Sequence, residues 1–252
     1  MKALFLTSSL NTNIEDENGN KIPIRFENKN NILDNFKKYI KKYDNFLYIA
    51  SNPENYLITD FYSNVVFKSF DLTLPFKNYI VLDNRNIKES SKLVSQADFI
   101  YLAGGHVPTQ NKFFNIINLK DLINKNNDVV ICGVSAGSMN CADIVYSPPE
   151  EKGEAIDKKY NRYLKGLGLT KININPHYID DEVIILDGLE VKKDILLPDS
   201  KRRPFFAYPD GTYILKTNNI VKIYGLSYRF ENGICHKFSN DEEVKNIEKY
   251  DI

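Results

Sequence analysis

The feature that most constrains the fold is a series of short, continuously apolar segments that alternate with longer segments of helical character. Continuous apolar runs predict strands that are buried on both faces, as in a parallel sheet covered by helices. Alternation of such strands with helices predicts an α/β sandwich with a mostly parallel sheet. The five predicted strands cover residues 2–8, 46–51, 79–83, 98–105 and 129–132.

The predicted helices lie between these strands. From Ile32 to Tyr43 the apolar residues recur at helical spacing, and Asn30 or Asn31 is available as an N-cap. The segment before this helix, residues 19–31, is polar and predicts irregular structure. Three more helices are predicted over residues 56–70, 86–97 and 109–124.

After about Leu164 the pattern changes to short strands separated by turn signals such as Pro-Asp-Gly and Glu-Asn-Gly. This pattern predicts an antiparallel extension of the same sheet. We find no Pro/Gly/Ser-rich linker and no internal repeat, which favours one domain over residues 1–252. The short strands are predicted over residues 171–175, 204–208, 213–216, 221–224 and 227–230.

The composition excludes several classes of partner. Lys and Arg total 33, as do Asp and Glu, so no overall charge would attract nucleic acid or an anionic membrane. No apolar run approaches the ~18–20 residues of a membrane span, and the first apolar run is too short for a secretion signal. The three cysteines, Cys132, Cys141 and Cys235, have no metal-binding spacing. We therefore expect a reduced, cytoplasmic setting; the oligomeric state stays open.

The sequence Gly-Val-Ser-Ala-Gly-Ser, residues 133–138, follows the fifth predicted strand. The spacing Gly-x-Ser-x-Gly is typical of a strained strand-to-helix turn that exposes a nucleophilic serine, here Ser135. The N–H of the next residue, Ala136, would then stand at a helix start and could bind an oxyanion. The alternative is an ordinary turn with an incidental serine, but the apolar strand before it and the small residues after it favour the nucleophile.

A serine nucleophile needs a base, and the chain offers three histidines. His106 and His177 each follow a predicted strand, at the sheet edge where α/β proteins form their sites. His177 also follows Asn-Pro, which ends the strand rigidly. His236 lies in the second arm of a late hairpin, and we expect it not to be catalytic.

The base in turn needs a carboxylate that holds its tautomer. Most acidic residues after His177 lie in polar loops, where a solvated surface position is the simpler interpretation. Asp210 stands apart because it lies between two apolar strands, although composition alone favours an ordinary hairpin turn for Pro-Asp-Gly. The full set is Asp180, Asp181, Glu182, Asp187, Asp194, Asp199 and Asp210.

Four segments in this order resemble the peptidase E group, which comprises the aspartyl dipeptidases (family S51) and relatives such as cyanophycinase. They are "FIYLAGGHVPTQNKFF", "GVSAGSMN", "INPHYID" and "AYPDGTYI", and the resemblance covers roughly residues 1–238. The resemblance implies a flavodoxin-like, three-layer α/β sandwich of the kind shared with class I glutamine amidotransferases. It implies Ser135 as nucleophile, His177 as general base and acid, and Asp210 as the orienting carboxylate. The N–H groups of Gly105 and Ala136 would form the oxyanion hole.

The chain departs from the family pattern around the expected substrate. His106 stands where the family usually has Asn after the glycine pair, so we expect Gly104 and His106 to line the substrate pocket. The acid is Asp rather than Glu. In aspartyl dipeptidases an arginine-bearing stretch after the histidine recognises the acidic substrate side chain, and here Lys192 or Lys193 lies in that stretch. A solvated charge run is the favoured interpretation of these lysines, and we infer no preference for N-terminal Asp.

Glu150 lies fifteen residues after Ser135, an offset at which the dipeptidases also carry an acid. The resemblance implies a role at the amino group of the substrate or in supporting the site, and an ordinary loop carboxylate is an equal alternative.

The leading hypothesis is a serine peptidase that cleaves short peptides as a dipeptidase or other exopeptidase, through an acyl-enzyme. No cofactor and no metal is expected, because no zinc-binding spacing and no phosphate-binding glycine motif occurs. Two alternatives are a non-catalytic binding protein on the same fold and an esterase or amidase. The order Ser, Asp, His of an α/β-hydrolase would require His236 as the base.

Overall fold

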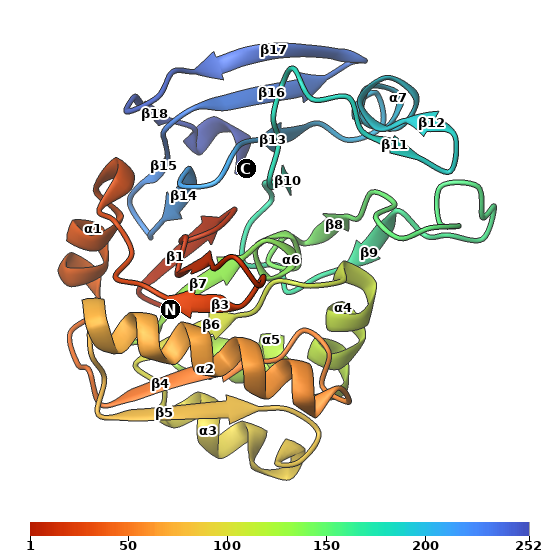
Figure 1. Cartoon of the computed structure of the whole chain (residues 1–252). Helices are drawn as coiled ribbons and strands as arrows, with labels where there is room; N and C mark the ends of the chain where they lie inside the picture. The colour runs from red at the N-terminus through yellow and green to blue at the C-terminus, as the bar shows by residue number, and fades with distance from the viewer. Residues whose placement is uncertain (252) are drawn as a thin grey trace.

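The centre of the molecule is one large sheet in which five neighbouring strands are parallel to one another (Figure 1). The computed structural model describes residues 1–251. The five predicted parallel strands are confirmed within a few residues. In spatial order they are β1 (Ala3–Thr7), β7 (Val130–Val134), β6 (Phe99–Leu102), β4 (Asn45–Ile49) and β5 (Asn78–Leu82).

Helices cover both faces of this sheet, as the continuous apolar strands predict. Along β1, Phe5 faces one layer and packs against Phe36 with ring centroids 4.6 Å apart, while Leu4 and Leu6 face the other layer. The first layer consists of α1 (Ile32–Tyr39) and α2 (Tyr56–Thr73). The second consists of α3 (Ser90–Gln96), α4 (Val107–Ile116), α5 (Leu119–Lys125) and α6 (Ala136–Met139). The result is the three-layer α/β sandwich that the sequence predicts.

Two local predictions are wrong. The helix expected over residues 109–124 is two helices, because Asn118 between α4 and α5 takes a left-handed conformation with φ of 50°. Asn tolerates this region better than most residues, and its side chain bonds Asp121 Oδ2 at 2.8 Å. The segment expected to be irregular contains a strand of a small hairpin formed by β2 (Asn13–Glu15) and β3 (Lys21–Pro23).

The predicted antiparallel extension is correct for only part of the C-terminal third. The strands β14 (Tyr213–Lys216), β15 (Val221–Tyr224) and β18 (Val244–Asn246) continue the large sheet beyond β1. The other strands form a second, separate sheet in the order β10 (Ile174–Asn175), β13 (Phe205–Ala207), β16 (Ser227–Glu231) and β17 (Ile234–Ser239).

The apolar pattern explains why this second sheet forms. Phe205 and Phe230 face a separate small core, where their rings stack with centroids 4.9 Å apart. Phe206 points the opposite way and joins the core of the large sheet. The strand β13 is therefore buried on both faces, and a period-two pattern identifies a strand without showing which sheet it joins.

Short elements connect the two sheets and surround the site described below. They are β8 (Ile144–Tyr146), β9 (Tyr163–Lys165), β11 (Ile185–Leu186), β12 (Leu189–Glu190), the π-helix η3 (Val191–Leu196) and α7 (Leu197–Ser200). Three single-turn helices complete the fold: η1 (Lys29–Asn31), η2 (Ile87–Glu89) and η4 (Glu248–Tyr250). Across residues 1–251, every helix is too short or too polar to cross a membrane.

Candidate active site

Ser135 occupies a strained turn between β7 and α6. Its φ of 50° and ψ of −118° fall in a region that non-glycine residues rarely adopt. The two glycines of the motif are required by packing: a Cβ at Gly133 would lie 2.6 Å from the backbone nitrogen of Ser138, and one at Gly137 would collide with the carbonyl of Leu102. The turn therefore presses against β6, and the Ser135 side chain faces the cleft at the carboxyl ends of the strands.

The glycine pair after β6 lies directly beside Ser135. A Cβ at Gly104 would lie 3.3 Å from the Cβ of Ser135. Parallel neighbours β6 and β7 end at the same edge of the sheet, which is why these two turns meet. Within residues 1–251, the N–H groups of Gly105 and Ala136 make no hydrogen bond, so both remain available as donors.

His177 and Asp210 form a hydrogen-bonded pair at the same edge. His177 Nδ1 lies 2.7 Å from Asp210 Oδ1. Ser8, which follows β1 and is fully buried, donates to the same Asp210 oxygen at 2.8 Å and accepts the His177 backbone N–H at 2.6 Å. His177 has a positive φ of 57°, and this bond to Ser8 helps to hold it there. The strands β7, β1 and β14 are neighbours, so the large sheet brings Ser135, Ser8 and Asp210 together.

The Asp210 carboxylate is stabilised in its charged form. Burial acts to raise the pKa of Asp210, but the hydrogen bonds from His177 and Ser8 outweigh it and hold the pKa below its usual value. Asp210 is therefore ionised at neutral pH and is placed to accept the Nδ1 proton of His177.

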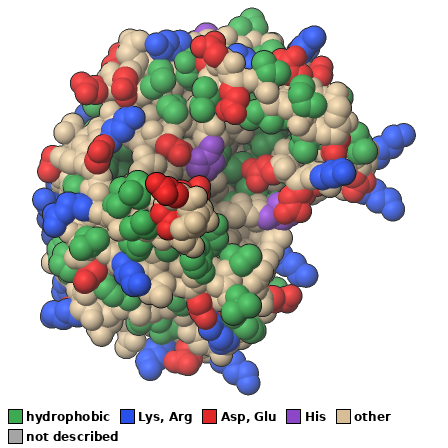
Figure 2. Space-filling model, in the orientation of Figure 1, with side chains coloured by type: hydrophobic (Ala, Val, Ile, Leu, Met, Phe, Trp, Pro, Cys, Tyr) green, Lys and Arg blue, Asp and Glu red, His purple; other side chains and the backbone are tan. Residues whose placement is uncertain are grey.

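Ser135 and His177 line one cleft, which also contains Gly104, Gly105 and His106. Figure 2 shows that this face of the molecule is hollowed, with histidine and acidic side chains around the hollow. Among residues 1–251, no hydrogen bond joins Ser135 to His177; catalytic hydrogen bonds are often long in free enzymes and tighten when substrate binds.

The second histidine of the cleft has a different set of partners. His106 Nε2 lies 2.9 Å from Glu154 Oε1, and His106 Nδ1 lies 2.8 Å from Thr109 Oγ1. The other oxygen of Glu154 accepts the backbone N–H groups of Glu150 and Glu151, each at 2.9 Å. Glu154 thus ties the loop after β8 to the start of α4.

Glu150 is exposed on the wall of this region, yet protein atoms crowd its carboxyl. This desolvation is the main reason that the pKa of Glu150 is raised to about 7; the charges of His106 and His177 act to lower the pKa, and the charge of Glu154 acts in the same direction as the desolvation. Glu150 therefore exchanges a proton near neutral pH.

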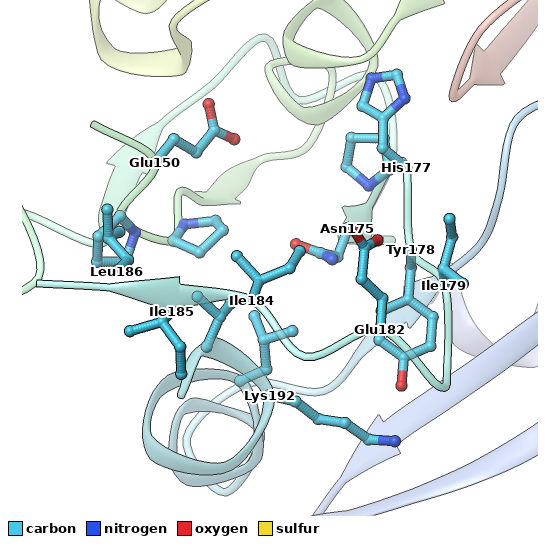
Figure 3. Close-up of a pocket in the computed structure, with 15 residues that line it drawn as sticks. Glu150, Asn175, His177, Tyr178, Ile179, Glu182, Ile184, Ile185, Leu186 and Lys192 are labelled. Carbon is cyan, nitrogen blue, oxygen red and sulfur yellow. The ribbon is translucent and has the colours of Figure 1, made fainter. Parts of the chain in front are cut away.

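A second hollow adjoins the cleft at His177. This apolar pocket has a volume of about 450 Å³, and Glu150, His177, Glu182 and Lys192 also line it. Figure 3 shows the side chains around it. Its apolar walls come from the loop between β10 and β11, from β11 and from η3, and include Ile179, Ile184, Ile185, Leu186, Val191 and Leu196.

One of the two lysines considered for substrate recognition, Lys192, lies in this wall but is already paired. Lys192 Nζ lies 2.7 Å from Asp180 Oδ1 and 3.1 Å from the Asp180 carbonyl oxygen. In Figure 3 the Lys192 side chain extends away from Ile184 and Ile185.

His236 lies on β17, where it pairs in register with Arg229, and it does not line the Ser135 cleft.

Among residues 1–251, one group brings three metal-type ligand atoms within 4.8 Å of one another: His106, Glu151 and Glu154. Two of these side chains already bond each other, and nothing else points to a metal there.

Sequence reasoning missed Ser8, Glu154 and the apolar pocket. Ser8 carried a usable signal, since it directly follows a strand at the edge where α/β sites form. Glu154 carried none, because its contact with His106 depends on the path of a long loop.

The profile of Peptidase family S51 matches residues 24–223, which is most of the chain. No curated protein sequence matches this chain significantly. A crystal structure of a peptidase from an acI-B1 Actinobacterium is 15% identical with a TM-score of 0.67, covering 98% of this chain and 97% of that one. A candidate Peptidase E protein from Listeria monocytogenes EGD-e is 17% identical with a TM-score of 0.59, covering 95% and 100%.

These structural neighbours share the fold of this chain, and the profile match covers the segments that hold Ser135, His177 and Asp210. The chain belongs to peptidase family S51 and is a serine-type peptidase.

Proposed function

We propose that the protein hydrolyses short peptides as an exopeptidase, with Ser135 as nucleophile, His177 as general base and acid, and Asp210 as the orienting carboxylate. One observation carries this assignment. His177 uses Nδ1 to bond Asp210 and, within residues 1–251, leaves Nε2 without a partner in the cleft that holds Ser135. A proton on Nδ1 leaves a lone pair on Nε2, which is the atom that must accept the serine proton.

The chemistry follows from these positions. Ser135 Oγ attacks the scissile carbonyl while His177 Nε2 takes its proton, and the carbonyl oxygen becomes an oxyanion. The N–H groups of Gly105 and Ala136 are free to stabilise that charge. His177 then protonates the leaving amine, and the C–N bond breaks to give an acyl-enzyme. Water, deprotonated by His177, hydrolyses the ester and regenerates Ser135.

His106 is a weaker candidate for the base. Both of its ring nitrogens are engaged, one by Glu154 and the other by Thr109, so neither is free to accept a proton from Ser135. We propose instead that His106 helps to form the wall of the substrate cleft.

Exopeptidase action is supported by the charges around the cleft. Glu151 lines the cleft, Glu154 lies next to Glu151, and Glu150 lines the adjoining pocket. These acidic groups complement the ammonium group of a short peptide. An ammonium group that leaves water on binding needs acidic partners of this kind. An endopeptidase would bind an internal peptide segment, which carries no ammonium group for these carboxylates to hold.

A fluorophosphonate probe tests the nucleophile directly. Wild-type protein should be labelled at Ser135, and Ser135→Ala and His177→Ala should lose the label while His236→Ala keeps it. Equal labelling of wild type and Ser135→Ala would overturn the assignment. Turnover of p-nitrophenyl esters with no dipeptide cleaved would replace the peptidase proposal with an esterase.

A further inference from the structure

The pocket beside His177 has apolar side chains that remain exposed. Ile179, Ile184 and Ile185 are 58%, 49% and 61% exposed, and all three line the same hollow. Contiguous exposed apolar surface next to a catalytic base is typical of a ligand subsite. The volume of about 450 Å³ falls within the range of roughly 300–1,000 Å³ for small-molecule sites.

The charges around this pocket are acidic. Glu150 and Glu182 line it, and in Figure 3 the Glu150 carboxylate and the His177 ring lie at the same end of it, above the isoleucines. The one cation that lines the pocket in the described part of the chain is Lys192, whose ammonium is held by Asp180. A substrate carboxylate placed here would meet two carboxylates and no free cation, whereas an ammonium beside Glu150 would be stabilised.

We infer that the apolar pocket binds the aliphatic or aromatic side chain of the N-terminal substrate residue, whose free α-ammonium is held by Glu150. This inference rests on the proposed exopeptidase function. It makes Ile184, Ile185 and Leu186 the residues that select the side chain. The substrates are then short peptides that begin with an apolar residue, rather than with Asp or Glu.

The experiment compares dipeptides that differ only in the N-terminal residue: Leu, Phe, Lys and Asp, each with a free and an acetylated amino group. The Leu and Phe peptides should have kcat/KM about 10- to 100-fold above the Asp and Lys peptides, the scale on which one pocket contact discriminates between substrates. Acetylation should cost the Leu peptide about tenfold, because it removes the charge that faces Glu150.

A matched pair of variants tests whether the pocket determines the selectivity. Ile184→Asn should remove most of the preference for Leu over Lys, while Val183→Asn should keep it. Val183 is the neighbouring residue, is 68% exposed and does not line the pocket. Fluorophosphonate labelling of both variants at the wild-type rate shows that folding and the nucleophile are intact.

The outcomes separate the two proposals. If the wild-type protein is neither labelled by the fluorophosphonate nor able to cleave any of the dipeptides, the catalytic assignment itself is overturned. Normal labelling with the Asp peptide cleaved best, or equal effects of the two Asn variants, would overturn the apolar subsite and leave the catalytic assignment standing.

Discussion

Two histidine–carboxylate pairs face the cleft that holds Ser135, and they differ in what each leaves free. His177 bonds Asp210 through Nδ1 and keeps Nε2 open, whereas His106 bonds Glu154 through Nε2 and Thr109 through Nδ1. Proximity of a histidine to an acid is therefore not enough to identify a base. The informative property is a ring nitrogen that has no other partner and belongs to a histidine lining the same cleft as the nucleophile.

The two histidines also differ in backbone conformation, and only His177 is strained. His106 has an ordinary extended conformation at the start of α4, with φ of −73° and ψ of 120°. His177 has a positive φ, which costs a non-glycine residue about 1–3 kcal/mol and persists where the surroundings enforce it. Ser8 enforces it by accepting the His177 N–H while donating to Asp210. The pair that we propose as catalytic is therefore the one with a strained backbone at His177 and with Ser8 bonded to both of its members.

The largest expected effect separates the two histidines directly. His177→Ala should lower kcat/KM for a cleaved dipeptide by about 10⁴- to 10⁶-fold, because the serine loses its base. His106→Ala should lower it by less than about 100-fold, since both ring nitrogens of His106 are already engaged and we assign it only to the wall of the cleft. Steady-state kinetics on the two variants measure the difference. A larger loss from His106→Ala than from His177→Ala would exchange their roles.

The carboxylates provide the next comparison. Asp210→Asn should reduce kcat on the order of 10³- to 10⁴-fold, because the amide does not stabilise the imidazolium and favours the wrong tautomer. Glu154→Gln should leave kcat within about tenfold and act mainly on KM, because Glu154 holds the backbone of Glu150 and Glu151. Separate kcat and KM values decide the matter. Equal losses of kcat in the two variants would argue against a special role for Asp210.

The parallel sheet and the serine turn could be predicted because their signals are local. Continuous apolar strands define the sheet, and Gly133 and Gly137 are required by contacts within the turn and with the adjacent strand. The second sheet could not be predicted, since the pattern around Phe205 and Phe206 identifies a strand but not its neighbours.

The candidate site follows the same rule. The order of Ser135, His177 and Asp210 was readable from short segments, whereas the apolar pocket needs residues from the loop after β10, from β11 and from η3 at once. Lys192 shows the limit most clearly. Its position suggested a carboxylate partner in the substrate, but its ammonium is held by Asp180 through contacts that spacing alone does not reveal.

Ser8 offers a test of the support beneath the catalytic pair. Ser8→Ala removes one hydrogen bond to Asp210 and the acceptor of the His177 N–H, so kcat should fall by about 10- to 100-fold. The hydrogen bond from Ser8 lowers the pKa of Asp210, so its removal should raise that pKa, which a carbon-13 NMR titration of the Asp210 carboxyl measures.

The pKa of Asp210 separates positioning from general destabilisation. A variant that only loosens the fold would lower the melting temperature and leave the pKa of Asp210 in place. Ser95→Ala, on the exposed surface of α3, is the matched control and should change neither quantity. An unchanged pKa of Asp210 in Ser8→Ala would contradict the role that we assign to Ser8.

The smallest expected effect concerns Glu150, which lies between the two pairs. Desolvation raises its pKa to about 7, Glu154 and Glu151 act in the same direction, and His106 and His177 oppose them. Glu150 is therefore neutral below this value and charged above it, while a peptide ammonium stays charged up to about pH 7.7–8.0. KM for a dipeptide with a free N-terminus should fall about five- to tenfold as pH rises from about 6 to about 7.7.

Glu150→Gln removes the titrating group with little change in shape, so its KM should stay near the low-pH value of the wild type across this range. The acetylated dipeptide should show no such pH dependence with either protein, because it carries no charge for Glu150 to bind. Measurement of KM against pH for both peptides and both proteins gives four curves, of which only one should slope. A second sloping curve, from Glu150→Gln with the free peptide, would place the titrating group elsewhere in the cleft.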